Sequence, residues 1–205
     1  MIYLVDANVV MQAANTYFRH SWVPEFWSWL HHHGSLGNIK MPLEIFQEIK
    51  DGSNNSEKDE LFAWASEKKN KDAILLADSV TSPLIRTVME NGYSLTLNEV
   101  QLQMIGQDPF LVAHALKDPG NRCVVTHEVS RPKAAAHNRK LPDACASVGV
   151  ACCTPFQMMQ SLGFKTAWNT PPVAPKTLPL PPKPFATAPN PLPPLPPPFP
   201  ISLPD

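Results

Sequence analysis

A proline-rich stretch at the C-terminal end restricts where this chain can build a folded core. From Pro171 to Asp205 nearly every second residue is proline, as in NPLPPLPPPFP. Proline fixes φ and lacks the backbone N–H that helices and sheets use, so such a stretch cannot form either. We expect residues 165–205 to be an extended or disordered tail, either a ligand for an aromatic groove or dispensable. Residues 1–164 are long enough for one domain.

Within residues 1–164, short apolar runs alternate with helical patterns. The runs predict strands at IYLV (2–5), IKMP (39–42), RCVVTHE (122–128) and VACC (150–153). Helical spacing predicts helices over 23–30, 43–50, 59–68, 82–91, 108–117, 141–149 and 154–164. Asp108 and Thr154 are the expected N-caps of two of them. This alternation predicts an α/β fold with a central parallel sheet and helices on both faces.

Several classes of protein are disfavoured by what the sequence lacks. No apolar stretch approaches membrane-spanning length, and the start has no signal-peptide pattern, so we expect a cytoplasmic protein with no membrane partner. The cysteines have neither Cys-x-x-Cys spacing nor a zinc pattern, which favours buried reduced thiols. They are Cys123, Cys145, Cys152 and Cys153.

Acidic residues recur where predicted strands end or the following helices begin. In parallel sheets the carboxyl ends of the strands share one edge, where ligands gather. Clustered carboxylates raise one another's pKa, and a hard divalent cation such as Mg²⁺ or Mn²⁺ relieves that conflict. The sequence therefore predicts a metal site built from Asp6, Glu48, Asp108, Glu128 and Asp143.

Each acid also has a structural interpretation. Asp6, Asp108 and Asp143 stand where a helix N-cap is expected. Glu44 and Glu48 lie four residues apart on one helix face, where either can simply be solvated. Each signal is weak alone, and the prediction depends on their order along the chain.

Four motifs in order resemble the PIN-like domain family, the fold of VapC-type toxin ribonucleases. They are YLVDANVV, EIFQEI, DPFLVAHAL and VVTHE. The segments PEFWSWL and LPDACASVGV are similar to a bacterial subgroup of that family. The resemblance covers residues 1–164 and implies a PIN-like α/β/α sandwich that cleaves RNA with Mg²⁺ or Mn²⁺. It further implies a toxin of a toxin–antitoxin pair, with an antitoxin protein as partner and a homodimer as a common assembly.

The resemblance also assigns roles to individual residues. The first three metal ligands would be Asp6, Glu48 and Asp108, with Glu128 in fourth position and Asp143 as a further acid. Asn8 would cap the first helix and brace Asp6, and the Thr126 hydroxyl would orient a ligand or water. One departure concerns the fourth position, where the family has Thr-x-Asp and this chain has Thr126-His127-Glu128.

Charge within residues 1–164 is uneven. There are 14 Lys and Arg against 17 Asp and Glu, so without the five proposed ligands the remainder is mildly basic. The loop RPKAAAHNRK is predicted to contact RNA phosphates through Arg131, Lys133, Arg139 and Lys140, or else to be a solvated loop. EKKNK at 67–71 indicates an exposed helix end. Trp22, Trp27 and Trp29 are first of all core residues, with base stacking a secondary interpretation.

Two other functions are compatible with the same residues. A PIN-like scaffold without catalysis would be a binding module, which Glu128 and the proline tail favour slightly. A phosphohydrolase of the haloacid-dehalogenase type also places Asp after the first strand, but it requires a second Asp two residues later. That position is Asn8, so this function ranks last.

Overall fold

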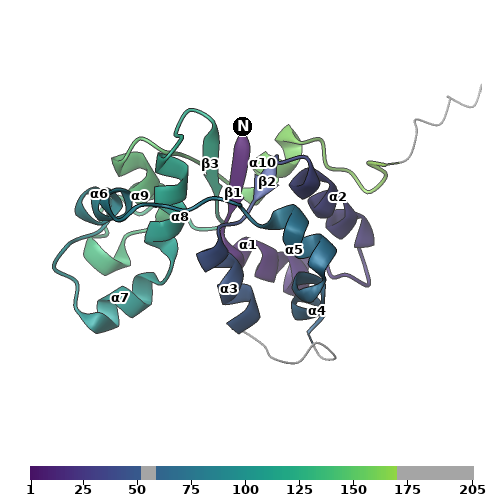
Figure 1. Ribbon diagram of the computed structural model, residues 1–205, viewed down its shortest axis with the longest axis horizontal. Helices are drawn as coiled ribbons and strands as arrows, with labels where there is room; N and C mark the ends of the chain where they lie inside the picture. The colour runs from purple at the N-terminus through teal and green to yellow at the C-terminus, as the bar shows by residue number, and fades with distance from the viewer. Residues whose placement is uncertain (52–58, 170–205) are drawn as a thin grey trace, which may run out of the picture. The chain divides into compact units, whose positions relative to one another are not determined.

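Four short strands form a parallel sheet at the centre of the domain (Figure 1). In the computed structural model, which describes residues 1–51 and 59–169, they are β1 Ile2–Val5, β2 Ile39–Lys40, β3 Arg122–Val125 and β4 Ala151–Cys153. The order is β2-β1-β3-β4, and all neighbours pair in parallel. Val5 pairs with Val125 and Val125 with Cys153, so three strands end at the same level of one edge.

Helices lie on both sides of this sheet. In Figure 1, α6, α8 and α9 lie on one side of the strands and α2, α5 and α10 on the other. This confirms the predicted α/β class with a parallel sheet between helices. The helical segments are α1 Ala7–Gln12, η1 Ala13–Tyr17, α2 Pro24–Ser35, α3 Leu43–Asp51, α4 Glu60–Ser66, α5 Lys68–Ile74, α6 Ser82–Gly92, α7 Glu99–Ile105, α8 Asp108–Leu116, η2 Ala136–Asn138, α9 Leu141–Ser147 and α10 Pro155–Ser161.

Strands β1 and β3 are apolar on both faces because helices cover the sheet on each side. Leu4 and Val124 are fully buried, as expected for inner strands covered by helices on each side. Trp29 of α2, Phe46 of α3 and Leu111 of α8 are equally buried. Each such side chain contributes roughly 1.5–3 kcal/mol of hydrophobic stabilisation. This packing holds the helices that carry the acidic residues against the sheet.

Two sequence predictions about element ends are wrong. Strand β3 ends at Val125 rather than Glu128, because the Thr126 hydroxyl accepts from the Glu128 N–H at 3.2 Å and turns the chain. Asp108 does not cap its helix, since Gln107 is the N-cap and Asp108 is the first helical residue. Thr154 does cap α10, in a capping box with Gln157.

The end of the compact unit involves residues beyond the predicted boundary at 164. Trp168 packs against His32 of α2 and donates from Nε1 to the Glu25 carbonyl at 3.0 Å. The unit spans Met1–Asn169. The predicted proline-rich tail lies, from residue 170 on, outside the described residues. In the described part of the chain, no helix has the length and apolarity needed to cross a membrane.

Candidate functional site

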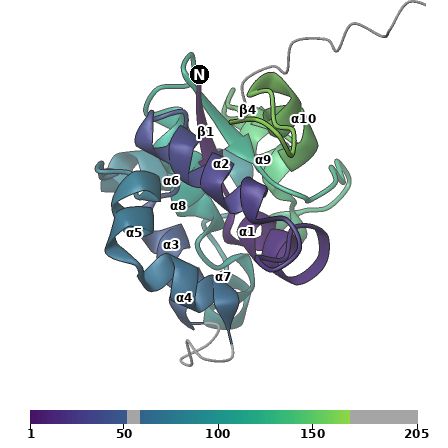
Figure 2. The same cartoon turned by 90° about the vertical axis from the view of Figure 1, so that its right-hand side faces the viewer.

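Four of the five predicted acids line one cavity of about 190 Å³ at the carboxyl edge of the sheet. Asp6 comes from the junction of β1 and α1, Glu48 from α3, Asp108 from the start of α8 and Glu128 from the loop after β3. Figure 2 shows α3 and α7 on the same lower side of the domain, beneath the strands. The remaining wall consists of Asn8, Leu141 and the segment 104–107.

Asp6 is buried and fixed by two donors. Its Oδ1 accepts from the Asn8 N–H at 3.4 Å and its Oδ2 from the Thr126 hydroxyl at 3.0 Å. Asp6 is therefore the N-cap of α1, and the prediction that Asn8 is the cap is wrong. Burial raises the pKa of Asp6, and the charge on Glu128 raises it further. Thr126, which also accepts from the Glu128 N–H, links these two acidic segments.

Asp108 has a strongly perturbed carboxyl group. Burial raises its pKa to about 8, with further contributions from Asp6, Glu128 and Glu48. Among residues 1–51 and 59–169, no hydrogen-bond donor contacts its side chain. A partly buried carboxyl without a donor is costly when ionised. A bound cation would offset this cost.

Glu128 is held by the loop that follows it. Its Oε1 forms an ion pair with the Lys140 ammonium at 2.5 Å, and its Oε2 accepts from the Leu141 N–H at 2.8 Å. Lys140, predicted to contact RNA, thus neutralises part of the acidic cluster and opposes the rise in the Asp108 pKa.

The donor set of the cavity suits a hard divalent cation. Carboxylate oxygens are the ligands that Mg²⁺ and Mn²⁺ prefer, and a cation relieves the mutual repulsion of the acids. Within the described ranges, no three His, Cys, Asp or Glu side chains are already arranged as a ligand set. The residues fit such an ion chemically, and its binding requires side-chain rearrangement, including competition with Lys140 for Glu128.

Gly106 shapes the wall of the cavity opposite Glu48. Its φ of 50° and ψ of −128° lie in a region that is essentially restricted to glycine. A Cβ atom at this position would lie 3.5 Å from Glu48 Oε1. The sequence analysis missed this wall because it did not predict α7. The capping box of Asn98 and Gln101 is the signal that could have located that helix.

Asp143 does not line the cavity. Its Oδ1 accepts from the Ser130 hydroxyl at 2.5 Å and its Oδ2 from the Arg131 N–H at 2.7 Å. Although burial opposes the effect, these hydrogen bonds lower the pKa of Asp143. The structure therefore shows Asp143 anchoring the basic loop rather than grouped with the other four acids.

The four predicted RNA contacts divide into two pairs. Arg131 and Lys133 are exposed and make no ion pair with any described residue. Arg139 instead donates to the Asp143 carbonyl and to Ser147, and Lys140 is paired with Glu128. Two basic side chains therefore remain open to a phosphate backbone.

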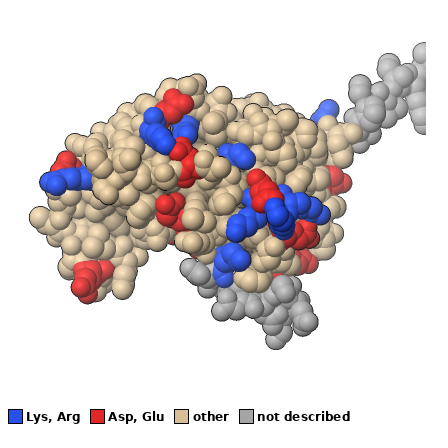
Figure 3. Space-filling model, viewed as in Figure 1, with Lys and Arg blue, Asp and Glu red and all other residues tan. Residues whose placement is uncertain are grey.

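The lysine-rich segment 67–71 is a different kind of surface. It begins α5, where Lys68 pairs with Asp72 and Lys69 pairs with Glu67 on the exterior. Figure 3 shows basic and acidic side chains gathered together over this helix. These lysines are balanced by neighbouring acids, which agrees with the expected exposed helix end.

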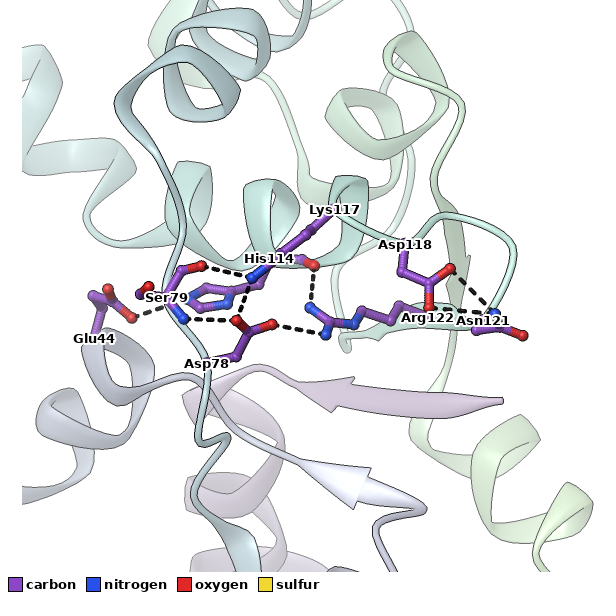
Figure 4. Close-up of polar contacts among 8 residues, drawn as sticks. All are labelled: Glu44, Asp78, Ser79, His114, Lys117, Asp118, Asn121 and Arg122. Atoms are coloured by element: carbon purple, nitrogen blue, oxygen red, sulfur yellow. Dashed lines mark hydrogen bonds and ion pairs between the residues drawn. The ribbon is translucent and has the colours of Figure 1, made fainter.

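A polar network braces the elements that carry the acids (Figure 4). His114 of α8 is fully buried, and its Nε2 lies 3.3 Å from Glu44 of α3. Arg122 at the start of β3 donates to the His114 carbonyl and to Asp78, each at 2.8 Å. Asp78 also pairs with Lys117. The network thereby ties α3, α8 and β3 together, and the cavity acids Glu48, Asp108 and Glu128 depend on those elements.

Comparison with known proteins gives a family for the chain. Residues 3–166 match the family model described as a domain of unknown function, DUF4411, and the chain belongs to that family. No curated protein and no solved structure matches the chain. The matched range contains every candidate residue of the cavity.

Proposed function

We propose that this DUF4411 chain is a PIN-like, metal-dependent endoribonuclease that hydrolyses RNA phosphodiester bonds. The observation that supports it most is the single cavity lined by Asp6, Glu48, Asp108 and Glu128. Four separate segments deliver these carboxylates to one edge of a parallel sheet, where ligands usually bind. The PIN-like fold itself and the RNA substrate are inferred from the resemblance of the motifs.

The side chains have distinct tasks in this proposal. Asp6, Glu48 and Asp108 would hold Mg²⁺ or Mn²⁺, and Glu128 would join them once it separates from Lys140. When bound, such an ion supplies activation of a water for in-line attack on the phosphate and stabilisation of the leaving 3′-oxygen. Thr126 keeps the Asp6 carboxylate oriented through its 3.0 Å hydrogen bond.

Basic residues of the loop after Glu128 would bind the RNA backbone. Arg131 and Lys133 are exposed and available to phosphates. Lys140, on releasing Glu128, becomes a further phosphate contact next to the acids. The expected products carry 5′-phosphate ends.

The biological setting follows from the resemblance alone. We propose a cytoplasmic toxin whose antitoxin protein covers the acidic edge, with a homodimer as the assembly. Expression of the wild-type chain alone should then arrest growth of a bacterial host, and the Asp6→Asn variant should not. Equal growth with both would contradict the toxin assignment without bearing on nuclease activity in vitro.

The direct test is cleavage of a mixed RNA substrate by purified protein with Mn²⁺. The Asp6→Asn variant keeps one acceptor oxygen for the Asn8 N–H, and its NH2 can donate to the Thr126 hydroxyl oxygen in place of the bond that Asp6 accepts. It loses the charge, so the fold should persist while the rate falls more than about 100-fold. EDTA should abolish cleavage by the wild type. Asp72→Asn, prepared identically, is the matched control, because Asp72 is exposed and, among the described residues, forms an ion pair with Lys68 alone. An unchanged rate in Asp6→Asn would contradict the proposal.

A catalytically inactive PIN-like binding module is the second candidate. This candidate is favoured because both carboxylate oxygens of Glu128 are already engaged, Oε1 by the Lys140 ammonium and Oε2 by the Leu141 N–H. Calorimetric titration with Mn²⁺ separates the two candidates. Saturable binding that Asp108→Asn removes supports the nuclease, whereas no binding by folded protein supports the module.

A further inference from the structure

Three aromatic rings, two of them exposed and one half-buried, form a cluster near the acidic cavity. Tyr17 ends η1, His127 follows β3 and Phe156 lies on α10, so the rings come from three distant segments. Their centroids lie 6.1 Å apart for Tyr17 and His127, 6.0 Å for Tyr17 and Phe156, and 6.3 Å for His127 and Phe156. Tyr17 is 49% exposed and Phe156 is 53% exposed. We call this trio the aromatic platform.

A second cavity lies next to the acids, and residues adjacent in sequence to two of the platform rings line it. This cavity, of about 270 Å³, is lined by Thr126 and Glu128 on one side and by Thr154 and Gln157 on the other. Glu128 also lines the acidic cavity, so the two hollows share a wall. His127 stands between two lining residues in sequence, and Phe156 directly precedes a third. His127 is therefore the direct sequence neighbour of Glu128, the acid that lines both cavities.

Packing in the core does not explain why Tyr17 and Phe156 are exposed to solvent. Phe26 and Trp29, by contrast, are almost completely buried in the core. Neighbouring aromatic rings that stay half exposed forgo hydrophobic stabilisation, and such patches mark interaction sites. The exposed Arg131 and Lys133 belong to the loop that follows His127, which adds positive charge for an anionic ligand.

We propose that Tyr17, His127 and Phe156 stack the unpaired bases of single-stranded RNA whose backbone passes the acidic cavity. Every nucleobase has a flat π-face, so stacking on rings tolerates any sequence but requires unpaired bases. Bases within a duplex are already paired and stacked, and A-form RNA offers side chains only its shallow minor groove. This inference rests on the proposed function for its choice of RNA, and it specifies single strands as the substrate class.

Binding measured without cleavage tests the platform. A fluorescently labelled, unstructured RNA of about ten nucleotides is titrated in EDTA by anisotropy, beside a duplex of the same sequence. Tyr17→Ala and Phe156→Ala should each weaken single-strand binding by about 5- to 150-fold. Tyr17→Phe keeps the ring and should bind like the wild type. Phe156→Leu keeps the apolar bulk but has no π-face, so it should bind RNA about as weakly as Phe156→Ala. This comparison separates base stacking from apolar packing.

The prediction that Trp22 is a core residue is wrong, since its side chain is 68% exposed. Trp22→Ala is the matched control, because Trp22 lies outside the platform and the Arg19 guanidinium already lies over its ring. It should leave RNA affinity unchanged. The proposal is overturned if the two alanine variants, folded by circular dichroism, bind like the wild type. It is equally overturned if the wild type binds no single-stranded RNA, prefers duplex, or uses this face only for a protein partner.

These outcomes are distinguishable from failure of the proposed nuclease. If the protein binds single strands through the platform but cleaves no RNA, this inference stands and the proposed enzymatic function fails. If cleavage depends on Asp6 but removal of the rings does not change RNA binding, the proposed function stands and the inference about the platform fails.

Discussion

Replacing Asp108 by asparagine should make the metal-free protein more stable at neutral pH. Burial and three neighbouring carboxylates raise the pKa of Asp108 to about 8, whereas an unfolded chain has the ordinary value of 3.8. Ionisation of this group therefore favours the unfolded state. Asparagine removes the charge at nearly constant size, and its amide can donate to a neighbouring carboxylate.

The size of the effect follows from proton linkage. A raised carboxyl pKa costs nothing below pH 4, and the cost grows through the window from 3.8 to 8. At 1.36 kcal/mol per pH unit the limit at pH 7 is about 4 kcal/mol. The N-terminus of α8 stabilises the ionised form of Asp108 by about 0.3–1 kcal/mol. The nearby Lys140 ammonium also lowers the free-energy cost of ionising Asp108. We expect a net gain in the free energy of unfolding of about 1–3 kcal/mol. Each kcal/mol should raise Tm by roughly 2–4 °C.

Thermal denaturation in EDTA measures this gain, with Asp72→Asn as the exposed control that should change stability by less than about 0.5 kcal/mol. The gain of Asp108→Asn should shrink as the pH falls from 7 toward 4. Addition of Mn²⁺ should stabilise the wild type but not Asp108→Asn. A variant that is less stable than the wild type in EDTA at pH 7, or that keeps the full Mn²⁺ response, would refute the reasoning.

Three further predictions concern the surroundings of the cavity. Lys140→Met leaves Glu128 without its cation, so metal-free stability should fall by about 1–2 kcal/mol and Mn²⁺ should restore it; an unchanged Tm in EDTA would contradict this. Burial lowers the pKa of His114, with Glu44 opposing, so protonation favours unfolding and stability present above about pH 6.5 is lost below it. Urea unfolding of His114→Gln should therefore show a shallower loss between pH 7 and pH 5, and an equal slope would argue against this assignment. Gly106→Ala should cost about 1–3 kcal/mol from backbone strain, while Gly120→Ala, with open space around it, should cost much less.

The parallel sheet and most helices were predictable because their signals are local. β-branched runs marked β1 and β3, and helical spacing marked α2, α3 and α8. Helix α7 was missed because its apolar residues Val100 and Met104 are exposed, so it lacks the buried stripe that spacing detects. The end of β3 was misplaced because Thr126 has high strand propensity, yet its hydroxyl redirects the chain.

The candidate site was predictable only as far as topology dictates it. Strand ends and helix starts converge at one edge, which is why Asp6, Asp108 and Glu128 could be grouped. Which way a side chain turns depends on partners distant in sequence. Asp143 turns to Ser130 and Arg131, and nothing in its spacing encodes that choice. The pairing of Lys140 with Glu128 bridges a loop and is likewise invisible to motif analysis.

The measurement closest to the central claim is the initial rate of single-stranded RNA cleavage as a function of Mn²⁺, for the wild type and Asp6→Asn in parallel. We expect the wild-type rate to rise with Mn²⁺ to a plateau, with 5′-phosphate products, and the variant to stay at background although folded. Cleavage that is independent of Mn²⁺, cleavage that is equal in the two proteins, or no cleavage by folded wild type saturated with Mn²⁺ would contradict an acidic metal centre at the end of β1.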